Sequence, residues 1–415
     1  MWLSFFYFCI LIELTMKIGL LKEEKVPVDK RVALTPKQCK EIQETYSNVE
    51  LVVESSVIRC FSDQQYISEG IKVVNDMSDC DVLFGVKEVP KQLLIPNKTY
   101  FYFSHTIKKQ PYNRDLLVRM IQMKINMVDY ESLKDEKGDR LLGFGRYAGI
   151  VGAYNGFLTY GLKSGQYILK AANQCKDRVE MEDQLKNVIL NNEKIVVTGH
   201  GRVGKGIMEI MRKSGVKEVD VDDFINQSFS YSVFVHLKTM DYNERVDGSL
   251  SNKADFYHNP QLYRSSFTRF ARIADIFIAG HYYGCNSPYL FTRDDTKSVD
   301  FNIKVVADIS CDIDGPVAST IRPSTIASPI YGYHPKTEKE VPFSKDDAIA
   351  VMAVSNLPCE LPKDASEDFG NDMLERIIPS LINGDKNKII YNATICSEGD
   401  LTSNFEYLRD FVNGN

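Results

Sequence analysis

The stretch KIVVTGHGRVGKGIMEIMRKSGVKEVDVDD, residues 194–223, decides the fold. It begins with an apolar run typical of a buried β-strand and continues into an amphipathic helix. Between the two, Gly199, Gly201 and Gly204 have the spacing G-x-G-x-x-G. A strand, a glycine-rich turn and a helix in this order are typical of a dinucleotide-binding βαβ unit. The sequence therefore predicts a doubly wound, Rossmann-like α/β domain in the middle of the chain.

Each glycine of this motif has its own physical task. Gly199 permits the tight turn, Gly201 lets the backbone approach a pyrophosphate, and Gly204 allows close packing of helix on strand. The helix N-terminus supplies N–H groups and a partial positive charge for the phosphates. We therefore expect the three glycines, together with the intervening Arg202 and Val203, to bind the cofactor. The alternative is a glycine-rich turn that binds nothing.

Asp220 is the candidate for recognition of the cofactor's ribose. It lies 21 residues after Gly199, in the segment EVDVDD (218–223), which reads as the next strand. A carboxylate at this place accepts hydrogen bonds from both ribose hydroxyls and repels a 2′-phosphate. The sequence therefore favours NAD as the cofactor, with NADP as the alternative.

Short apolar runs and helix-like segments alternate on both sides of this unit. This βαβ rhythm predicts parallel sheets covered by helices on both faces. The upstream strands are expected at 16–21, 49–55, 82–87, 99–104 and 125–130, the upstream helices at 35–46 and 113–123, and further downstream strands at 274–280 and 303–310. The segment 225–266 lacks a clear periodicity of apolar residues, so no helix or strand is predicted within it.

The glycine-rich segment 143–165 reads as a packed helix between two domains. Ala148, Gly152 and Gly156 recur every four residues, which places small residues on one helix face. Another backbone can approach closely along such a face.

The composition excludes several classes of protein. A chain of 415 residues with 44% hydrophobic residues has material for two or three cores, which excludes a disordered or fibrous protein. The 50 basic residues against 56 acidic ones give a net charge of −6, which argues against a nucleic-acid binder. The nine cysteines are scattered without a C-x-x-C pair, so we expect no metal site and reduced thiols in a cytoplasmic enzyme.

The N-terminal stretch MWLSFFYFCILIELT, residues 1–15, is apolar but lacks a basic start and a small-residue cleavage site. It is also shorter than the roughly 20 residues of a membrane span. We expect Met16 to be the functional start and residues 1–15 to be an upstream extension. A membrane or export signal is the alternative.

Two polar residues end apolar strands in the N-terminal half. Lys87 ends VLFGVK, and His105, the only histidine before residue 200, follows TYFYFS. Ligands bind at the carboxyl edge of parallel sheets. A partly desolvated lysine has a lowered pKa, and a histidine needs little tuning for proton transfer. We therefore predict that Lys87 and His105 form an acid–base pair, the alternative being a solvated lysine and a loop histidine.

Three further charged residues stand at strand ends. Arg31 follows the first strand, and its planar guanidinium suits a substrate carboxylate. A surface arginine is the alternative. Asp308 and Asp312 follow a later strand, where a carboxylate is expected either to face the nicotinamide ribose or to cap the next turn.

Several of these segments resemble a known superfamily. The segments IGLLKEEKVPVDKRVALTP (18–36), GVKEVP (85–90) and FSHTIK (103–108) are similar to those of the alanine dehydrogenase, transhydrogenase and saccharopine dehydrogenase superfamily.

Three longer segments narrow the resemblance. FYFSHTIKKQ (101–110), VDYESLKDEKGDRLLGFGRYAGIVGA (128–153) and SNLPCELPKDASEDFG (355–370) resemble the lysine-forming saccharopine dehydrogenases. The likeness is greatest to the lysine–ketoglutarate reductase half of the animal bifunctional lysine-degrading enzyme, and it covers nearly the whole chain from Met16.

The resemblance implies two Rossmann-like domains with the active site in the cleft between them. It implies a substrate domain made of residues 16–155 and 330–415, and a dinucleotide-binding domain of residues 156–329. It also implies that Lys87 and His105 are the acid–base pair. Arg31 would hold a substrate carboxylate, and Glu131 and Arg140 would line the site.

The implied reaction is the reversible conversion of saccharopine, NAD and water to lysine, 2-oxoglutarate and NADH. One residue departs from the pattern. Many saccharopine dehydrogenases have an aspartate before the Asn-Leu-Pro motif, at a position that contacts the nicotinamide side. This chain has Ser355 there, as alanine dehydrogenases do. Reductive amination of pyruvate therefore remains an alternative, as does a non-catalytic NAD-binding regulator. The expected partners are small-molecule substrates, with an oligomer possible.

Overall fold

The computed structural model describes residues 15–284 and 286–414. The chain forms two compact units: unit 1 ends at Gly143 and resumes at Ala365, and unit 2 comprises Phe144–Asp364. The interpretation of residues 1–15 as an extension falls, except for Thr15, outside the described residues. The cleft expected between the domains stays a prediction.

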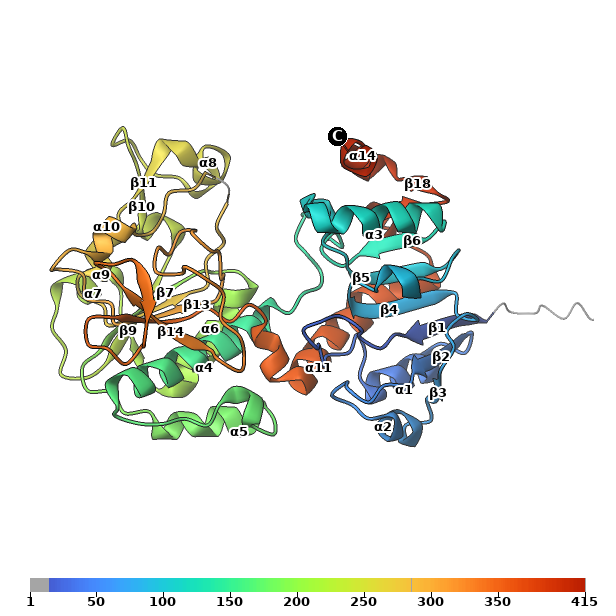
Figure 1. Ribbon diagram of the computed structural model, residues 1–415, viewed down its shortest axis with the longest axis horizontal. Coiled ribbons are helices and arrows are strands. Elements are labelled where there is room, and N and C mark those ends of the chain that lie inside the picture. Colours follow the sequence, from blue (N-terminus) through green and yellow to red (C-terminus); the bar gives the residue numbers. More distant parts are fainter. Residues whose placement is uncertain (1–14, 285, 415) are drawn as a thin grey trace, which may run out of the picture. The chain divides into compact units, whose positions relative to one another are not determined.

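Within the described residues, unit 1 contains one eight-stranded sheet with the order β18-β17-β6-β5-β4-β1-β2-β3 (Figure 1). The six strands from β1 to β6 pair in parallel and have the order 3-2-1-4-5-6 of a doubly wound domain. Their bounds are β1 (Met16–Leu20), β2 (Val49–Glu54), β3 (Lys72–Val74), β4 (Val82–Lys87), β5 (Thr99–Phe103) and β6 (Asn126–Asp129).

Local sequence signals explain where the helices of unit 1 begin. At the start of α1, the side chain of Thr35 accepts a hydrogen bond from the N–H of Gln38, and the N–H of Thr35 donates one to Oε1 of Gln38. Pro36 occupies the first helical position. The helices that precede the crossing into unit 2 are α1 (Pro36–Thr45), α2 (Asp63–Ser68) and α3 (Pro111–Gln122). The expected strands and helices of this part of the chain are therefore confirmed.

The C-terminal segment completes the sheet of unit 1. Strand β17 (Thr394–Ser397) pairs antiparallel with β6, and β18 (Asp400–Leu401) pairs with β17. The guanidinium of Arg114 in α3 donates hydrogen bonds to the carbonyl oxygens of Phe411 and Val412. The helices of this segment are α11 (Pro362–Asp372), α12 (Ile378–Asn383), α13 (Ile389–Ala393) and α14 (Arg409–Asn413).

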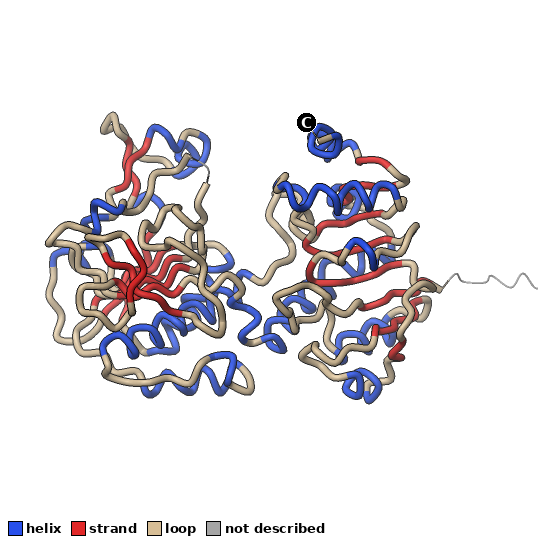
Figure 2. Tube along the Cα trace, viewed as in Figure 1, coloured by secondary structure: helices blue, strands red, loops and turns tan. Residues whose placement is uncertain are grey.

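Unit 2 contains a second eight-stranded sheet among its described residues, with the order β15-β14-β16-β13-β12-β7-β9-β8 (Figure 2). Its strands are β7 (Lys194–Thr198), β8 (Lys217–Glu218), β9 (Val233–Leu237), β12 (Ile276–Ala279), β13 (Val305–Asp308), β14 (Ile330–His334), β15 (Lys339–Val341) and β16 (Ile349–Met352). A separate hairpin joins β10 (Asn243–Arg245) to β11 (Tyr263–Ser265). Two Rossmann-like α/β units are thus present, as predicted.

The domain boundaries differ from the expected ones. Residues 330–364 were assigned to the substrate domain, but β14 and β16 belong to the sheet of unit 2 because β16 pairs with β13. Residues 145–155, also assigned to the substrate domain, form the first half of a helix of unit 2. The sequence could not reveal either change because both depend on long-range strand and helix pairing.

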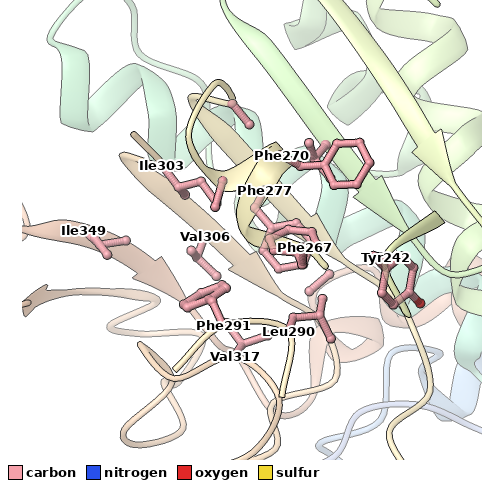
Figure 3. Close-up of a cluster of buried hydrophobic side chains, with 14 of the residues drawn as sticks. Tyr242, Phe267, Phe270, Phe277, Leu290, Phe291, Ile303, Val306, Val317 and Ile349 are labelled. Carbon is pink, nitrogen blue, oxygen red and sulfur yellow. The ribbon is translucent and has the colours of Figure 1, made fainter. Parts of the chain in front are cut away.

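Aromatic and aliphatic side chains pack together in the core of unit 2 (Figure 3). The rings of Phe267 and Phe277 have their centroids 4.7 Å apart, and Phe291 packs edge-on against Phe277. Aliphatic residues of the parallel strands, such as Val306, fill the spaces between the rings. The strand ends of this unit therefore rest on a closely packed core.

Small residues let helix α4 (Gly145–Ser164) approach helix α6 (Arg202–Ser214) backbone to backbone. A Cβ on Gly149 would lie 2.0 Å from the carbonyl oxygen of Val203. On another face of α4, a Cβ on Gly152 would lie 2.4 Å from Ile309. The backbone approach thus occurs at Gly149 and not on the face of Ala148, Gly152 and Gly156, where Gly152 and Gly156 meet side chains, and α4 packs within unit 2. The other helices of unit 2 are α5 (Arg178–Asp183), α7 (Val221–Asn226), α8 (Lys253–His258), α9 (Thr268–Ala271) and α10 (Arg293–Thr296).

The segment 218–223, predicted as a strand, is largely helical. Strand β8 ends at Glu218, and Asp220 caps helix α7 by accepting a hydrogen bond from the N–H of Asp223 at 2.8 Å. Capping by an aspartate and an acidic first turn favour the helix. On this side of β7 the neighbouring strand is β9, which lies in the poorly periodic segment 225–266.

No helix in the described part of the chain is both long and apolar enough to cross a membrane.

Candidate active site

Lys87 and His105 lie at the same edge of the unit 1 sheet. Lys87 ends β4, which pairs in parallel with β5 and brings Lys87 beside Phe103. His105 follows two residues later, with a φ of 56° and its ring stacked on that of Phe103 at 6.3 Å between centroids. A left-handed conformation is costly for a residue with a side chain, so its surroundings must hold His105 in place.

Burial lowers the pKa of Lys87, and the neighbouring charge of Arg31 lowers it further. A lysine in this environment carries its proton less firmly than a solvated one.

The carboxylate of Glu131 lies close to three basic side chains at this edge of the sheet. Its carboxylate lies 3.5 Å from Nδ1 of His105, 3.3 Å from Nζ of Lys108 and 3.6 Å from Nη2 of Arg140. Burial acts to raise the pKa of Glu131, but the contact with His105 and the charges of Lys108 and Arg140 outweigh it and lower the pKa to about 2. Glu131 is therefore ionised at neutral pH and puts a negative charge beside Nδ1 of His105.

Asp129, at the end of β6, holds the two loops that carry His105 and Glu131. It accepts hydrogen bonds from the backbone N–H and the hydroxyl of Ser104 and from the N–H of Glu131 at 2.6 Å. The hydroxyl of Ser104 is in turn 2.8 Å from that of Thr106. One buried carboxylate thus fixes the residues on both sides of His105 and the backbone of Glu131.

Glu23 holds the end of β4 in a similar way. Its two carboxylate oxygens accept hydrogen bonds from the N–H groups of Val86, at 2.6 Å, and Lys87, at 2.9 Å. Burial raises the pKa of Glu23 to about 7. Next to Lys87, Glu88 forms an ion pair with Lys25.

Arg31 is deeply buried, with 3% of its surface exposed, and its guanidinium pairs with the carboxylate of Asp29. This partner was not anticipated from the sequence. The predicted role of Arg31 in holding a substrate carboxylate stays a prediction.

Sequence reasoning missed Asp29, Glu23, Glu88, Lys108 and Asp129. Glu23 and Lys108 stand inside the segments that carry the family resemblance, so the resemblance was the available signal. Asp129 ends a predicted strand, as His105 does, and the same argument from strand ends applies to it.

The glycine-rich turn of unit 2 has the geometry that a pyrophosphate site requires. Gly199 has a φ of +99°, and a Cβ on it would lie 2.1 Å from the carbonyl oxygen of Gly280. A Cβ on Gly204 would lie 1.9 Å from the carbonyl oxygen of Gly199, whereas a Cβ on Gly201 would meet no atom within 4 Å. Open space at Gly201, directly before the first residue of α6, leaves room for a bound group at the helix N-terminus. Arg202 and Val203 form the first turn of this helix. These residues fit a dinucleotide.

The other predicted cofactor residues have different surroundings. Asp308 is fully buried and accepts hydrogen bonds from Ser310, from the N–H of Cys311 and from the hydroxyl of Thr320, so it caps the turn after β13. Asp312 and Ser355 are exposed beyond the ends of β13 and β16. Their roles toward a cofactor stay predictions. Within the described residues no cluster of three or more potential metal ligands is found.

Comparisons with known proteins show similarity to one protein family and to two solved structures. Residues 19–151 match the family described as alanine dehydrogenase/PNT, N-terminal domain. The fold is shared with an L-alanine dehydrogenase, at a TM-score of 0.65 and 17% identity over 95% of this chain and 100% of that one. A transhydrogenase from Sinorhizobium meliloti matches at a TM-score of 0.58 and 14% identity, over 93% of this chain and 100% of that one.

Proteins of similar sequence match most of the chain at higher identity than these structures do. The chain is 28% identical to an alpha-aminoadipic semialdehyde synthase of Arabidopsis thaliana over 94% of its length, covering 41% of that protein. It is 25% identical to the lysine-forming saccharopine dehydrogenase [NAD(+)] of Yarrowia lipolytica, over 87% of this chain and 90% of that one. The chain spans less than half the length of the semialdehyde synthases that it matches.

The resemblance stated from the sequence is therefore confirmed. The chain is similar to the lysine-forming saccharopine dehydrogenases and the semialdehyde synthases, and its N-terminal part is similar to the alanine dehydrogenase/PNT family.

Proposed function

We propose that this chain catalyses the reversible oxidation of saccharopine to lysine and 2-oxoglutarate with a nicotinamide dinucleotide. The observation that carries the proposal is the pairing of Lys87 and His105 at neighbouring strand ends, with the carboxylate of Glu131 beside Nδ1 of His105. The sequence relatives named saccharopine dehydrogenase support it.

The reaction needs two proton carriers in addition to the cofactor. A nicotinamide dinucleotide held at Gly199, Gly201 and Gly204 would supply the hydride acceptor for oxidation of the carbon that bears the secondary amine to an imine. Lys87, whose pKa is lowered, accepts the proton of that amine at Nζ. Water then adds to the imine carbon, the C–N bond breaks, and lysine and 2-oxoglutarate result.

His105 moves the proton in the hydrolytic half of the reaction. Because Nδ1 faces Glu131, Nε2 is the atom that takes a proton from the attacking water and returns it to the departing amine. The ionised Glu131 stabilises the imidazolium that exists between these two events. The backbone anchors from Glu23 and Asp129 keep both proton carriers in place.

The charges at this edge suit a substrate with several carboxylates. Lys108 and Arg140 are both close to half exposed, with 50% and 47% of their side chains accessible, so each has a cationic group that a substrate carboxylate can reach. Saccharopine carries three carboxylates and pyruvate only one. Two accessible cations in addition to Arg31 therefore suit the larger substrate.

Alanine dehydrogenase activity is the second candidate. The shared fold with L-alanine dehydrogenase and the serine at position 355 favour it. A nicotinamide oxidation assay with lysine plus 2-oxoglutarate, beside ammonium plus pyruvate, separates the candidates. Turnover of the first pair alone supports the proposal, and turnover of the second pair alone contradicts it. Binding of the nucleotide without turnover of either pair favours the non-catalytic regulator.

The choice between NAD and NADP was predicted from Asp220. Since β9 separates β8 from β7, Asp220 does not end the strand beside the glycine-rich turn. The preference for NAD over NADP therefore has no support from the position of Asp220 and stays a prediction.

A further inference from the structure

The loop that carries His105, residues 104–110, has an unfavourable backbone conformation near both of its ends. His105 has a φ of 56° and Lys109 a φ of 52°, so two residues with side chains lie in the left-handed region. Residues in this region persist where the surrounding structure holds them. The loop therefore depends on contacts with other parts of unit 1.

The contacts near His105 come from β6 and from the start of α3. Asp129 accepts hydrogen bonds from the N–H and the hydroxyl of Ser104. The side-chain amide of Asn113 donates a hydrogen bond to the carbonyl oxygen of His105 at 3.2 Å. Asn113 is buried and lies in the first turn of α3. The position of His105 is therefore linked to the position of α3.

The C-terminal segment, residues 402–414, contacts the other end of the loop. The ammonium group of Lys109 lies over the ring of Tyr407, 5.4 Å from its centroid. Burial raises the pKa of Tyr407, and the charge of Asp129 raises it further, so Tyr407 also lies near the carboxylate that binds Ser104. Tyr407 therefore interacts with one end of the loop and with the residue that fixes the other end.

Arg114 of α3 binds the same segment. Its Nε donates a hydrogen bond to the carbonyl oxygen of Phe411 at 2.9 Å, and its Nη2 donates one to that of Val412 at 2.7 Å. Both carbonyls belong to α14, which lies beside α3 (Figure 1), and a cation near the C-terminal end of a helix stabilises that helix. Since Arg114 directly follows Asn113, the turn of α3 that binds the carbonyl of His105 is itself fixed by the C-terminal segment.

We propose that the C-terminal segment holds the loop of His105 in place, and that Arg114 and Tyr407 are positioning residues of the reaction. The proposal rests on the proposed function only in so far as that function makes His105 a proton carrier. Neither residue needs to touch a substrate, because Arg114 acts through Asn113 and Tyr407 acts through Lys109. Loss of either contact lets the loop relax from its left-handed conformation, and His105 then loses its place at the edge of the sheet.

Hydrogen–deuterium exchange of the full chain tests this proposal without a substrate. The N–H groups of Lys108 and Lys109 donate hydrogen bonds within the loop, at 3.2 and 3.1 Å, and report its opening. Both should exchange at least about tenfold faster in Arg114→Met, since loss of one charge-assisted hydrogen bond corresponds to roughly 10–150-fold. Tyr407→Leu should accelerate them by about two- to fivefold, the range for an exposed cation–π contact.

Matched variants separate a local effect from a general loss of stability. Tyr407→Phe keeps the ring and should exchange as the wild type does. Arg409→Met removes an arginine that forms its ion pairs within the C-terminal segment, and loop exchange should stay within about twofold of wild type. The N–H groups of Val86 and Lys87 at the end of β4 are the reference and should be unaffected. Equal acceleration in the loop and at this reference overturns the proposal, as does unchanged loop exchange in both Arg114→Met and Tyr407→Leu.

Turnover of lysine with 2-oxoglutarate tests the catalytic consequence. Arg114→Met should lower kcat by at least about tenfold, while the dissociation constant of the nucleotide stays within about twofold of wild type. Faster loop exchange together with wild-type kcat overturns the positioning role. A chain that turns over no substrate pair contradicts the proposed function, whereas the exchange result still decides whether the C-terminal segment holds the loop.

Discussion

The predicted reactivity of Lys87 and of His105 depends on different surroundings. Burial lowers the pKa of Lys87, whereas His105 has the carboxylate of Glu131 3.5 Å from its Nδ1. We expect Lys87→Met and His105→Gln each to lower turnover by roughly 10²–10⁴-fold, the range for loss of a general acid or base. Steady-state rates and the dissociation constant of the reduced cofactor, which should change little, are measured for each variant. The exposed Lys72 of β3 provides a matched control as Lys72→Met. Wild-type turnover in either site variant would show that the residue takes no part in proton transfer.

The charge of Arg31 gives a second prediction, which concerns pH. Burial and then Arg31 lower the pKa of Lys87, so the neutral lysine becomes available at lower pH than for a solvated lysine. The rate of saccharopine oxidation should therefore rise with pH and level off above that lowered pKa. Arg31→Gln removes the charge and should move the rising limb to higher pH, whereas Arg31→Lys retains the charge and should leave the limb in place. Identical shifts in both variants would mean that the charge of Arg31 has no effect on Lys87.

At the scale of elements, patterns within one segment were predictable and pairings between segments were not. The turn of Gly199, Gly201 and Gly204 was found in the sequence because strand, turn and helix are contiguous. Strand β9 was missed because its segment lacks periodicity and because its place beside β7 depends on a pairing across more than thirty residues. Asp220 was expected beside β7, but β8, the next strand in sequence, is not the next strand in the sheet. Its role toward the ribose stays a prediction.

The same limit applies to the candidate site in unit 1. Lys87 and His105 were recognisable because each ends an apolar run. Glu23 was not recognisable from its pattern, because its role consists of hydrogen bonds to the backbone of Val86 and Lys87, 63 and 64 residues away in sequence. A buried carboxylate that binds distant backbone groups leaves no local periodic signal.

The contact between α4 and α6 gives a prediction at the same scale. In a free helix, replacing Gly149 by alanine would stabilise by about 0.5–1 kcal/mol. Here the new Cβ would lie 2.0 Å from the carbonyl oxygen of Val203, so the two helices must separate. We expect Gly149→Ala to lower the free energy of unfolding by about 1–3 kcal/mol. It should also weaken nucleotide binding, because Val203 belongs to the first turn after Gly201.

Urea denaturation and nucleotide titration measure these two effects, with Leu162→Ala as a control at an exposed position on the same helix. Unchanged stability of Gly149→Ala would mean that the helices adjust at no cost. A loss of stability without a loss of nucleotide binding would mean that the turn is held independently of α4.

At the scale of the whole molecule, the chain crosses twice between units, after Gly143 and after Asp364. The segments next to both crossings are joined within unit 2 by one buried carboxyl. The side chain of Asn155 in α4 donates a hydrogen bond to Glu360 at 2.9 Å, and the backbone N–H of Asn173 donates a second. Glu360 is 5% exposed, and burial raises its pKa to about 7. The packing of α4 against the segment before α11 is therefore linked to proton binding near neutral pH.

The sign of that linkage gives the last prediction. Between pH 4.5 and about 7, the folded chain holds a proton on Glu360 that the unfolded chain has released, so the stability due to this group falls as pH rises. Since each pKa unit is worth about 1.4 kcal/mol, the loss over this window is at most about 3.5 kcal/mol. Glu360→Gln cannot ionise, so its stability relative to wild type should increase by up to that amount between pH 5 and pH 8. Denaturation midpoints of both proteins across this range, with Glu218→Gln as an exposed control, measure the difference. A constant difference across the range would mean that Glu360 titrates alike in the folded and unfolded chain, and that its burial is offset by the two hydrogen bonds it accepts.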